Sequence, residues 1–165
     1  MKRLLKFVAF LLLLAIVFGA GWLTATLGIG KAVPIASLPE RERQFAERMQ
    51  NSALVGYFTI AGREDRTLRP DRYEISSVEK IGDDRWRFNA KIGETGVSAP
   101  MVVPMQFLGD TPMISMTDFE IPTVGTFTVR VIFYGDQYFG SWQHGKFGGI
   151  MFGKVEKAGT ASPKP

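Results

Sequence analysis

The sequence predicts a mainly β protein: an N-terminal transmembrane helix, a short amphipathic helix, and then about eight antiparallel strands forming a small up-and-down barrel or a curled sheet. Three observations predict this fold. Residues 7–30 carry no charge, residues 38–49 repeat apolar residues at helical spacing, and the chain from Ala53 onward alternates apolar and polar residues between turn residues. A two-sheet sandwich is the alternative arrangement of the same strands.

The uncharged segment 7–30 is long enough to cross a bilayer, which needs about 20 apolar helical residues. A cleaved signal peptide is the alternative, with a shorter apolar region of roughly 7–15 residues followed by a small-residue cleavage site. Phe18 and Trp22 interrupt the best-spaced small residues, around Ala20. The sequence therefore favours a retained signal-anchor, and the partner of residues 7–30 is the membrane.

Charge predicts the orientation of this anchor. Lys2, Arg3 and Lys6 precede the span without an acidic residue among them, whereas Lys31 alone follows closely. Basic residues near a span stay in the cytoplasm. The expected protein is single-pass in the inner (cytoplasmic) membrane, with its N-terminus inside and its C-terminal domain in the cell envelope outside. If the segment is cleaved, the protein is secreted or periplasmic.

Three regions follow from this division: a basic N-terminus, anchor and linker (1–36), an exported helix and β domain (37–157), and a disordered tail rich in small residues (158–165). The net charge of +4 belongs to the first region, because residues 1–37 contain four basic residues and no acid. The rest of the chain holds 16 basic and 16 acidic residues. A nucleic-acid partner is therefore not expected.

The exported part is expected to open with a helix. Ser37 is a candidate N-cap, Pro39 suits the first turn, and Glu40 stands three residues after Ser37, as a capping box requires. One face of this helix is apolar and predicted to pack on the domain; it consists of Leu38, Phe45, Ala46 and Met49.

The strands are expected at 53–61, 72–81, 85–92, 97–108, 113–119, 126–134, 138–143 and 149–156. The clearest is 85–92, in which Trp86 and Phe88 alternate with Arg85 and Arg87. Pro100 and Pro104 cannot donate to a strand ladder, so they predict an edge position or bulges for their strand. Gly135 and Asp136 form a tight hairpin turn.

Catalysis is not expected. The chain lacks cysteine, which excludes disulfides, thiolate metal sites and cysteine nucleophiles. His144 is the only histidine, so an imidazole-based metal site cannot form, and no cofactor is expected. Ser141 and His144 would face opposite sides of a strand and so would not form a nucleophile and base pair.

The segment 139–153, FGSWQHGKFGGIMFG, combines five glycines with aromatic residues, and glycines in strands mark bends or close backbone approach. The G-S-W of Gly140–Trp142 resembles the G-x-W of lipocalin-like barrels, although there the motif lies on the first strand. The run W-x-H-G-x-x-G-G-x-M-F-G is similar to the closing hairpin of uncharacterised bacterial envelope proteins. The resemblance implies a barrel that binds a small apolar molecule.

Two functions remain open. The first is binding of a small apolar ligand or lipid, because flexible methionine side chains adapt to variable apolar shapes. The second is a non-enzymatic scaffold or protein-interaction domain with a solid core, whose partner the sequence does not specify. The candidate ligand-binding residues are Met101, Met105, Met113, Met116, Trp142, His144 and Met151.

Overall fold

The computed structural model describes residues 2–26, 32–62, 68–92, 98–121 and 125–158. It divides the chain into two compact units, Met1–Lys31 and Ala32–Pro165. The predicted disordered tail, apart from Ala158, lies outside the described residues.

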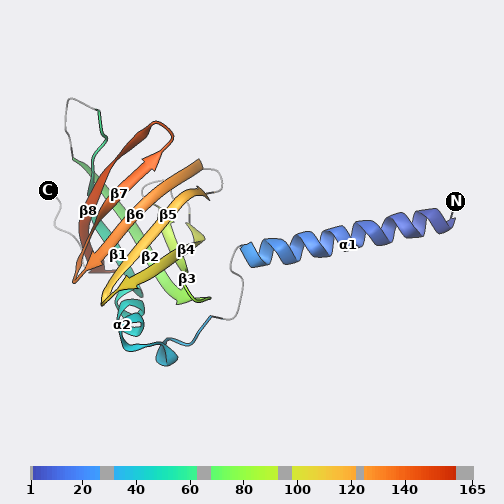
Figure 1. Ribbon diagram of the computed structural model, residues 1–165, viewed down its shortest axis with the longest axis horizontal. Helices are drawn as coiled ribbons and strands as arrows, with labels where there is room; N and C mark the ends of the chain where they lie inside the picture. The colour runs from blue at the N-terminus through green and yellow to red at the C-terminus, as the bar shows by residue number, and fades with distance from the viewer. Residues whose placement is uncertain (1, 27–31, 63–67, 93–97, 122–124, 159–165) are drawn as a thin grey trace. The chain divides into compact units, whose positions relative to one another are not determined.

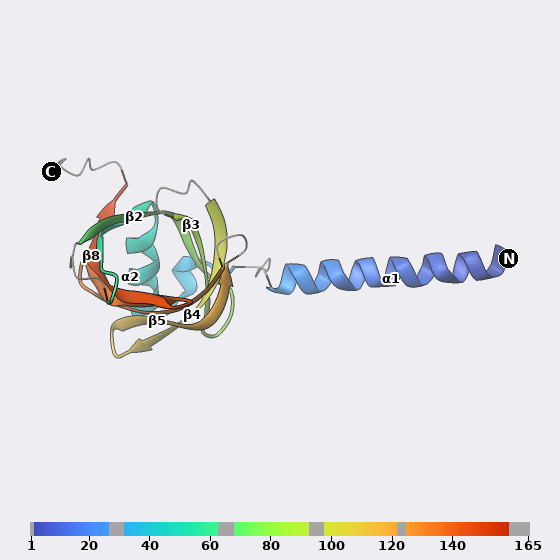
Figure 2. The same ribbon diagram turned by 90° about the horizontal axis from the view of Figure 1, so that it is seen from above.

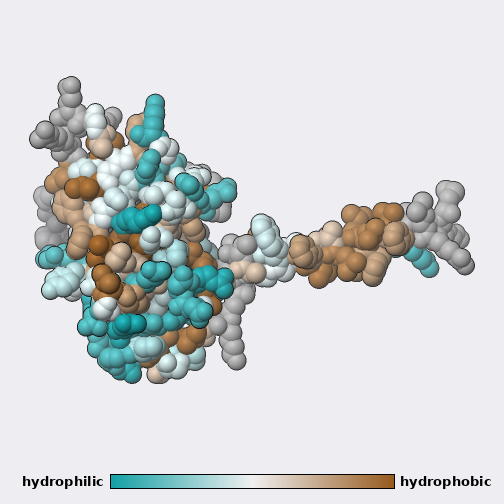
Figure 3. Space-filling model, in the orientation of Figure 1, coloured by the Kyte–Doolittle hydropathy of each residue, from teal (hydrophilic) through white to brown (hydrophobic). Residues whose placement is uncertain are grey.

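The first unit is a single helix, α1 (Lys2–Thr26). Its segment Lys6–Ala25 is long and apolar enough to span a membrane, which fits a single-pass anchor; a signal sequence would meet the same criteria of length and composition. The side chains of this segment are exposed, and Figure 3 shows hydrophobic residues along the helix. An apolar surface of this kind must lie in lipid, or the segment that carries it must be cleaved from the protein.

The second unit is a closed barrel of eight antiparallel strands in chain order (Figure 1). Each strand pairs with the next, and β1 pairs with β8 to close the ring. The predicted barrel is therefore confirmed. The strands are β1 (Ser52–Phe58), β2 (Arg69–Lys80), β3 (Arg85–Ile92), β4 (Ser98–Leu108), β5 (Thr111–Ile121), β6 (Gly125–Tyr134), β7 (Gln137–His144) and β8 (Phe147–Lys157).

Three of the hairpins turn in two residues, the first a glycine with a positive φ: Gly109 at 61°, Gly135 at 59° and Gly145 at 57°. Two-residue hairpin turns require this left-handed conformation, which glycine adopts without steric cost. The expected tight turn at Gly135 is confirmed.

The proline-containing strand β4 is not a sheet edge, because it lies between β3 and β5. However, β4 pairs with β5 only over Met105–Leu108, whereas Ser98–Pro104 pairs with β3. The Met105 N–H donates to the Asp84 carbonyl on the β3 side, so strand alternation directs the nitrogens of Pro100 and Pro104 toward β5. The prolines therefore occupy positions where no ladder donor is needed.

The second helix, α2 (Glu40–Met49), begins three residues after the expected cap, and the predicted capping box is wrong. Ser37 lies in a short 3₁₀ turn, η1 (Ile35–Ser37), and its hydroxyl donates to the Pro34 carbonyl. Leu38 is extended, with φ −72° and ψ 150°. The physical reason is Pro39, which pushes the preceding residue away from helical angles.

The apolar face of α2 closes one end of the barrel, and Figure 2, which looks along the barrel, shows α2 within the ring of strands. Phe45 is the centre of this plug, with a relative exposure of 2 %. Its ring makes edge-to-face contacts at centroid distances of 5.3–6.4 Å with Trp86, Phe88, Phe107 and Phe133. The predicted packing of Leu38, Phe45, Ala46 and Met49 on the domain is confirmed.

Polar contacts hold the plug in place. Glu42 is buried and accepts from Lys80 Nζ at 2.6 Å. Lys157 Nζ lies 3.1–3.2 Å from the carbonyl oxygens of Glu47, Arg48 and Gln50 at the helix end. A cation at this position stabilises the free carbonyls of a helix C-terminus.

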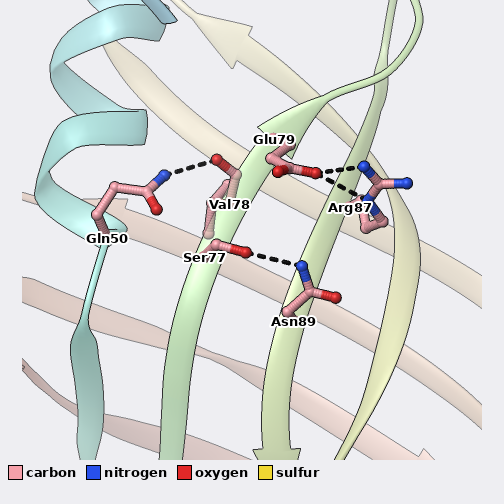
Figure 4. Close-up of polar contacts among 6 residues, drawn as sticks. All are labelled: Gln50, Ser77, Val78, Glu79, Arg87 and Asn89. Carbon is pink, nitrogen blue, oxygen red and sulfur yellow. Dashed lines mark hydrogen bonds and ion pairs between the residues drawn. The ribbon is translucent and has the colours of Figure 1, made fainter. Parts of the chain in front are cut away.

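Further contacts join α2 to β2 and β2 to β3 (Figure 4). Gln50 Nε2 donates to the Val78 carbonyl at 2.7 Å, and Asn89 Nδ2 donates to Ser77 Oγ at 2.7 Å. Glu79 and Arg87 form an ion pair on the outer wall. The plug is thus tied to the wall by hydrogen bonds as well as by its apolar face.

Within the described part of the chain, the hydrophobic core and the apolar residues packed against it lie between Ile35 and Val155. The unit 32–165 therefore contains its whole core together with its plug, which is what an independently folding domain requires.

Candidate functional site

Register and alternation identify which side chains point into the barrel. Beside α2, the inward-facing side chains are fully buried; Trp86, Val103 and Met105 have relative exposures of 1–3 %. Farther from α2, inward-facing side chains are only partly buried. We call this region the distal lumen; its wall includes Phe58, Met101, Met116, Val129, Trp142, His144 and Met151.

One row of paired, inward-facing residues crosses four strands, from Tyr138 in the buried core to the partly exposed Asp71. Asp71 on β2 pairs with Gly56 on β1, Gly56 with Gly153 on β8, and Gly153 with Tyr138 on β7. The two glycines leave the wall between Asp71 and Tyr138 without side chains. The Tyr138 ring occupies this space, so its hydroxyl reaches across β8 to β1 and lies 2.7 Å from the position of a Cβ on Gly56.

Close backbone approach explains why these positions are glycine. A Cβ on Gly56 would lie 2.1 Å from the Phe152 carbonyl oxygen, and one on Gly153 would lie 2.2 Å from the Val55 carbonyl oxygen. Gly140 and Gly149 are equally restricted, by the carbonyl oxygens of Arg130 and Thr59. The glycines of the segment 139–153 thus shape the barrel wall.

Among the residues that the structure describes, two inward-facing donors are buried without a hydrogen-bond partner: the Tyr138 hydroxyl and Trp142 Nε1. Tyr138 is 1 % exposed. Trp142 leans toward β1 as well, because its ring lies edge-to-face on Phe58 at a centroid distance of 5.8 Å. A buried unpaired donor costs about 1–3 kcal/mol, so each one in a native protein calls for a physical reason.

The acid at the end of the row interacts with two phenols. Burial raises the pKa of Tyr73 well above its usual range, and a hydrogen bond from its hydroxyl to Asp71 adds to the shift. Burial raises the pKa of Tyr138 to about 12, and the negative charge of Asp71 adds to the shift. Both phenols are therefore neutral donors at physiological pH.

His144 lies near the end of β7. Its ring stacks on Phe127 at a centroid distance of 4.3 Å and an interplanar angle of 20°. Its Nε2 lies 2.7 Å from the position of a Cβ on Gly125, whose φ is +117°. His144 faces inward and Ser141 pairs with the outward-facing Arg130, so the two side chains lie on opposite sides of β7. No group of acids and histidine within the described ranges is arranged to hold a metal ion.

Six of the seven candidate residues face the barrel interior: Met101, Met105, Met116, Trp142, His144 and Met151. Met105 belongs to the buried core beside the plug, whereas the other five line the distal lumen. Met113 lies between the buried residues Pro112 and Ile114 and pairs with Ile132, so it faces outward. Their role in ligand binding stays a prediction.

Sequence reasoning missed Asp71, Tyr73 and Tyr138. The strand expected at 72–81 begins at Arg69 instead, so Asp71 lay just outside the expected strand. Tyr138 could have been found, because Tyr138, Gly140 and Trp142 alternate on the inward face of β7. The pairing of Tyr138 with two glycines, however, depends on long-range register.

The outer wall carries a second apolar feature. Five outward residues pair in one row across β1, β8, β7, β6 and β5, which we call the outer row: Tyr57, Phe152, Phe139, Ile132 and Met113. Tyr57 and Phe139 are each 44 % exposed. Figure 3 shows hydrophobic patches on the barrel face that carries β5–β8.

A hollow of about 230 Å³ lies between α2 and the turns after β4 and β6. Its two cations serve the fold, because Arg41 donates to the Gly109 carbonyl and Arg48 to the Gly135 carbonyl. These contacts fasten the plug to two hairpins.

No protein-family model matches this chain, and no curated protein or solved structure is significantly similar to it.

Proposed function

We propose that the protein is a membrane-anchored extracytoplasmic β domain whose distal lumen binds one small apolar ligand, such as a lipid. The observation that carries the proposal is the change of exposure along the barrel interior: inward-facing side chains are buried beside the plug and partly exposed away from it. An eight-stranded barrel is just wide enough to hold one small ligand.

The chemistry of the wall supports this proposal. Met101, Met116 and Met151 contribute flexible thioethers, and Phe58 and Trp142 contribute aromatic surface. Ligand pockets are mostly apolar with a few well-placed polar groups. Here the polar groups are Tyr138, Trp142 and the Asp71–Tyr73 pair.

Extraction of the purified protein with organic solvent, followed by mass spectrometry, tests the proposal. We expect an apolar molecule of a single chemical class at close to one per chain. The unit 32–165, expressed for export without the anchor, provides a preparation free of detergent and membrane lipid. A preparation that folds but releases no molecule, and that takes up none when lipid is added, would contradict the proposal.

We also propose that α1 stays in the inner membrane with the N-terminus in the cytoplasm, on the basis of Lys2, Arg3 and Lys6 before the span. Because the chain has no cysteine, Ser141→Cys on the exposed outer wall gives a single labelling site. A membrane-impermeant maleimide should label this variant in intact spheroplasts; labelling only after lysis would reverse the orientation. N-terminal sequencing of the mature protein should begin at the basic N-terminus.

The outer row favours a second candidate function, a protein-interaction domain of the envelope. Exposed contiguous apolar surface on a folded domain marks contact sites. Phe139→Lys at the centre of the row, compared with Lys154→Glu beside it, should then abolish association measured by light scattering or cross-linking. A domain that is monomeric and uncross-linked in cells with Phe139 intact would leave this candidate without support.

A further inference from the structure

The buried polar groups that point into the barrel indicate which head group the ligand proposed for the distal lumen carries. We infer that the ligand is an amphipathic molecule with an uncharged oxygen head, such as an alcohol or an ester, and that this head accepts hydrogen bonds from the Tyr138 hydroxyl and Trp142 Nε1. The inference rests on the proposed function and deepens it.

The two donors are placed for a single ligand. Both residues lie on β7, four positions apart and on the same face, and both side chains lean across β8 to β1. The Tyr138 hydroxyl lies over Gly56, and the Trp142 ring contacts Phe58. These two β1 residues are about 7 Å apart along a strand, a span that the head of one small lipid covers.

Both donors are buried and unpaired, and that is the second observation. The Asp71 carboxylate does not satisfy Tyr138, since it accepts instead from the Tyr73 hydroxyl and the Arg72 N–H. A bound acceptor would pair both donors and recover the free energy that their burial costs.

The charge of the lumen selects a neutral head. Asp71 lies at the end of the row toward which Tyr138 points, and it forms no ion pair with any described residue. The one cation on the inward-facing side of the β2 segment 69–75 is Arg69, which is exposed at the strand's first position. A fatty-acid carboxylate placed at Tyr138 would meet the negative Asp71 in a site of low dielectric. An alcohol head, in contrast, can accept from Tyr138 and donate to Asp71.

Displacement of a fluorescent hydrocarbon tests the head group. Diphenylhexatriene has no polar atom, so its binding to unit 32–165 reports the apolar lumen alone. Oleyl alcohol, 1-octadecene and oleate then compete for the same site at pH 7. We expect oleyl alcohol to displace the probe at roughly tenfold lower concentration than 1-octadecene, and oleate to be weaker than the alcohol.

Tyr138→Phe should raise the concentration of oleyl alcohol needed to displace the probe by about three- to tenfold, and should leave the concentration of 1-octadecene unchanged. Trp142→Phe should weaken displacement by oleyl alcohol to a similar extent, and it provides a second variant if the first does not fold. Asp71→Asn should bring the displacing concentration of oleate closer to that of oleyl alcohol. Tyr57→Phe, the same substitution on the outer row, should change the displacing concentration of neither oleyl alcohol nor 1-octadecene.

The outcomes separate the two proposals. If diphenylhexatriene and all three competitors fail to bind the folded domain, the proposed function itself fails. If they bind but Tyr138→Phe and Trp142→Phe leave the ratio of alcohol to octadecene unchanged, the lumen is a hydrocarbon site, a buried water pairs the donors, and the head-group inference is overturned. Oleate binding more tightly than the alcohol in the wild-type domain would overturn it as well.

Discussion

The Tyr138 hydroxyl lies over Gly56, 2.7 Å from the position that a Cβ would occupy there, and has no hydrogen-bond partner. The aromatic ring thus lies against Gly153 on the adjacent strand, and its hydroxyl lies against Gly56 on the second strand away. Packing explains the ring but leaves the hydroxyl without a structural role.

Tyr138→Phe should leave the free energy of unfolding of the ligand-free domain unchanged or raise it by up to about 1 kcal/mol, because it removes a buried donor that has no partner. Tyr73→Phe should lower it by about 1 kcal/mol, because the Tyr73 hydroxyl bonds Asp71. Urea denaturation of both variants measures the difference. A loss of stability in Tyr138→Phe equal to that in Tyr73→Phe would mean that the Tyr138 hydroxyl is paired in the free protein.

Gly56→Ala should destabilise the domain by about 1–3 kcal/mol, since the new methyl group would overlap the Phe152 carbonyl and displace the Tyr138 ring. Gly82→Ala is the matched control: its nearest neighbour is Arg85 Nε at 3.1 Å, on a flexible side chain. Thermal unfolding followed by circular dichroism compares them. Equal midpoints for the two variants would show that β1 and β8 are not in close contact at this row.

Glu42→Gln should destabilise the plug by roughly 3 kcal/mol, because it leaves the Lys80 ammonium buried without its counter-charge. Glu40→Gln breaks the exposed pair with Arg43 and should cost less than about 0.5 kcal/mol. The double variant Glu42→Gln with Lys80→Met should recover most of the loss. If Glu42→Gln is no worse than Glu40→Gln, α2 is not held by this contact.

Stability should fall at alkaline pH. The pKa of Tyr138 is raised to about 12 in the folded protein, whereas an unfolded tyrosine titrates near pH 10. Above about pH 10 the unfolded chain therefore releases a proton that the folded chain retains, so the stabilisation present below this pH is lost as the pH rises to about 12. The loss for this one group is roughly 2–3 kcal/mol.

Tyr138→Phe should reduce the alkaline loss by that amount, whereas Tyr57→Phe should not. Chemical denaturation at pH 8 and at pH 11.5 measures both. Identical pH profiles for wild type and Tyr138→Phe would contradict the burial of this phenol.

Local patterns predicted the elements of this fold well. Period-two alternation identified each of the eight strands, and β3 was expected at 85–92 as found. The closure of the ring by β1 and β8 depends on pairs nearly a hundred residues apart, which no local pattern records. The same limit applies to Met113, because pairing places it on the outer row although its apolar character suggested the interior.

The site was predicted in part. Methionines and Trp142 could be selected by chemical character, and five of the seven candidates line the distal lumen. Asp71 and Tyr73 could not be selected in this way. An acidic side chain at the start of a strand, such as Asp71, is usually exposed to solvent. The burial of Glu42 could not be predicted for a related reason: a charged side chain on a helix is expected in water unless a partner such as Lys80 is known from the fold.

The most direct test of the central claim is to fill the distal lumen with a side chain. Met116→Trp faces inward from β5 and should abolish saturable binding of diphenylhexatriene to unit 32–165, whereas Met113→Trp, three residues away on the outer face, should leave it unchanged. The account predicts one site per wild-type domain, lost only in the inward variant. Equal binding by both folded variants, or none by the wild-type domain, would contradict it.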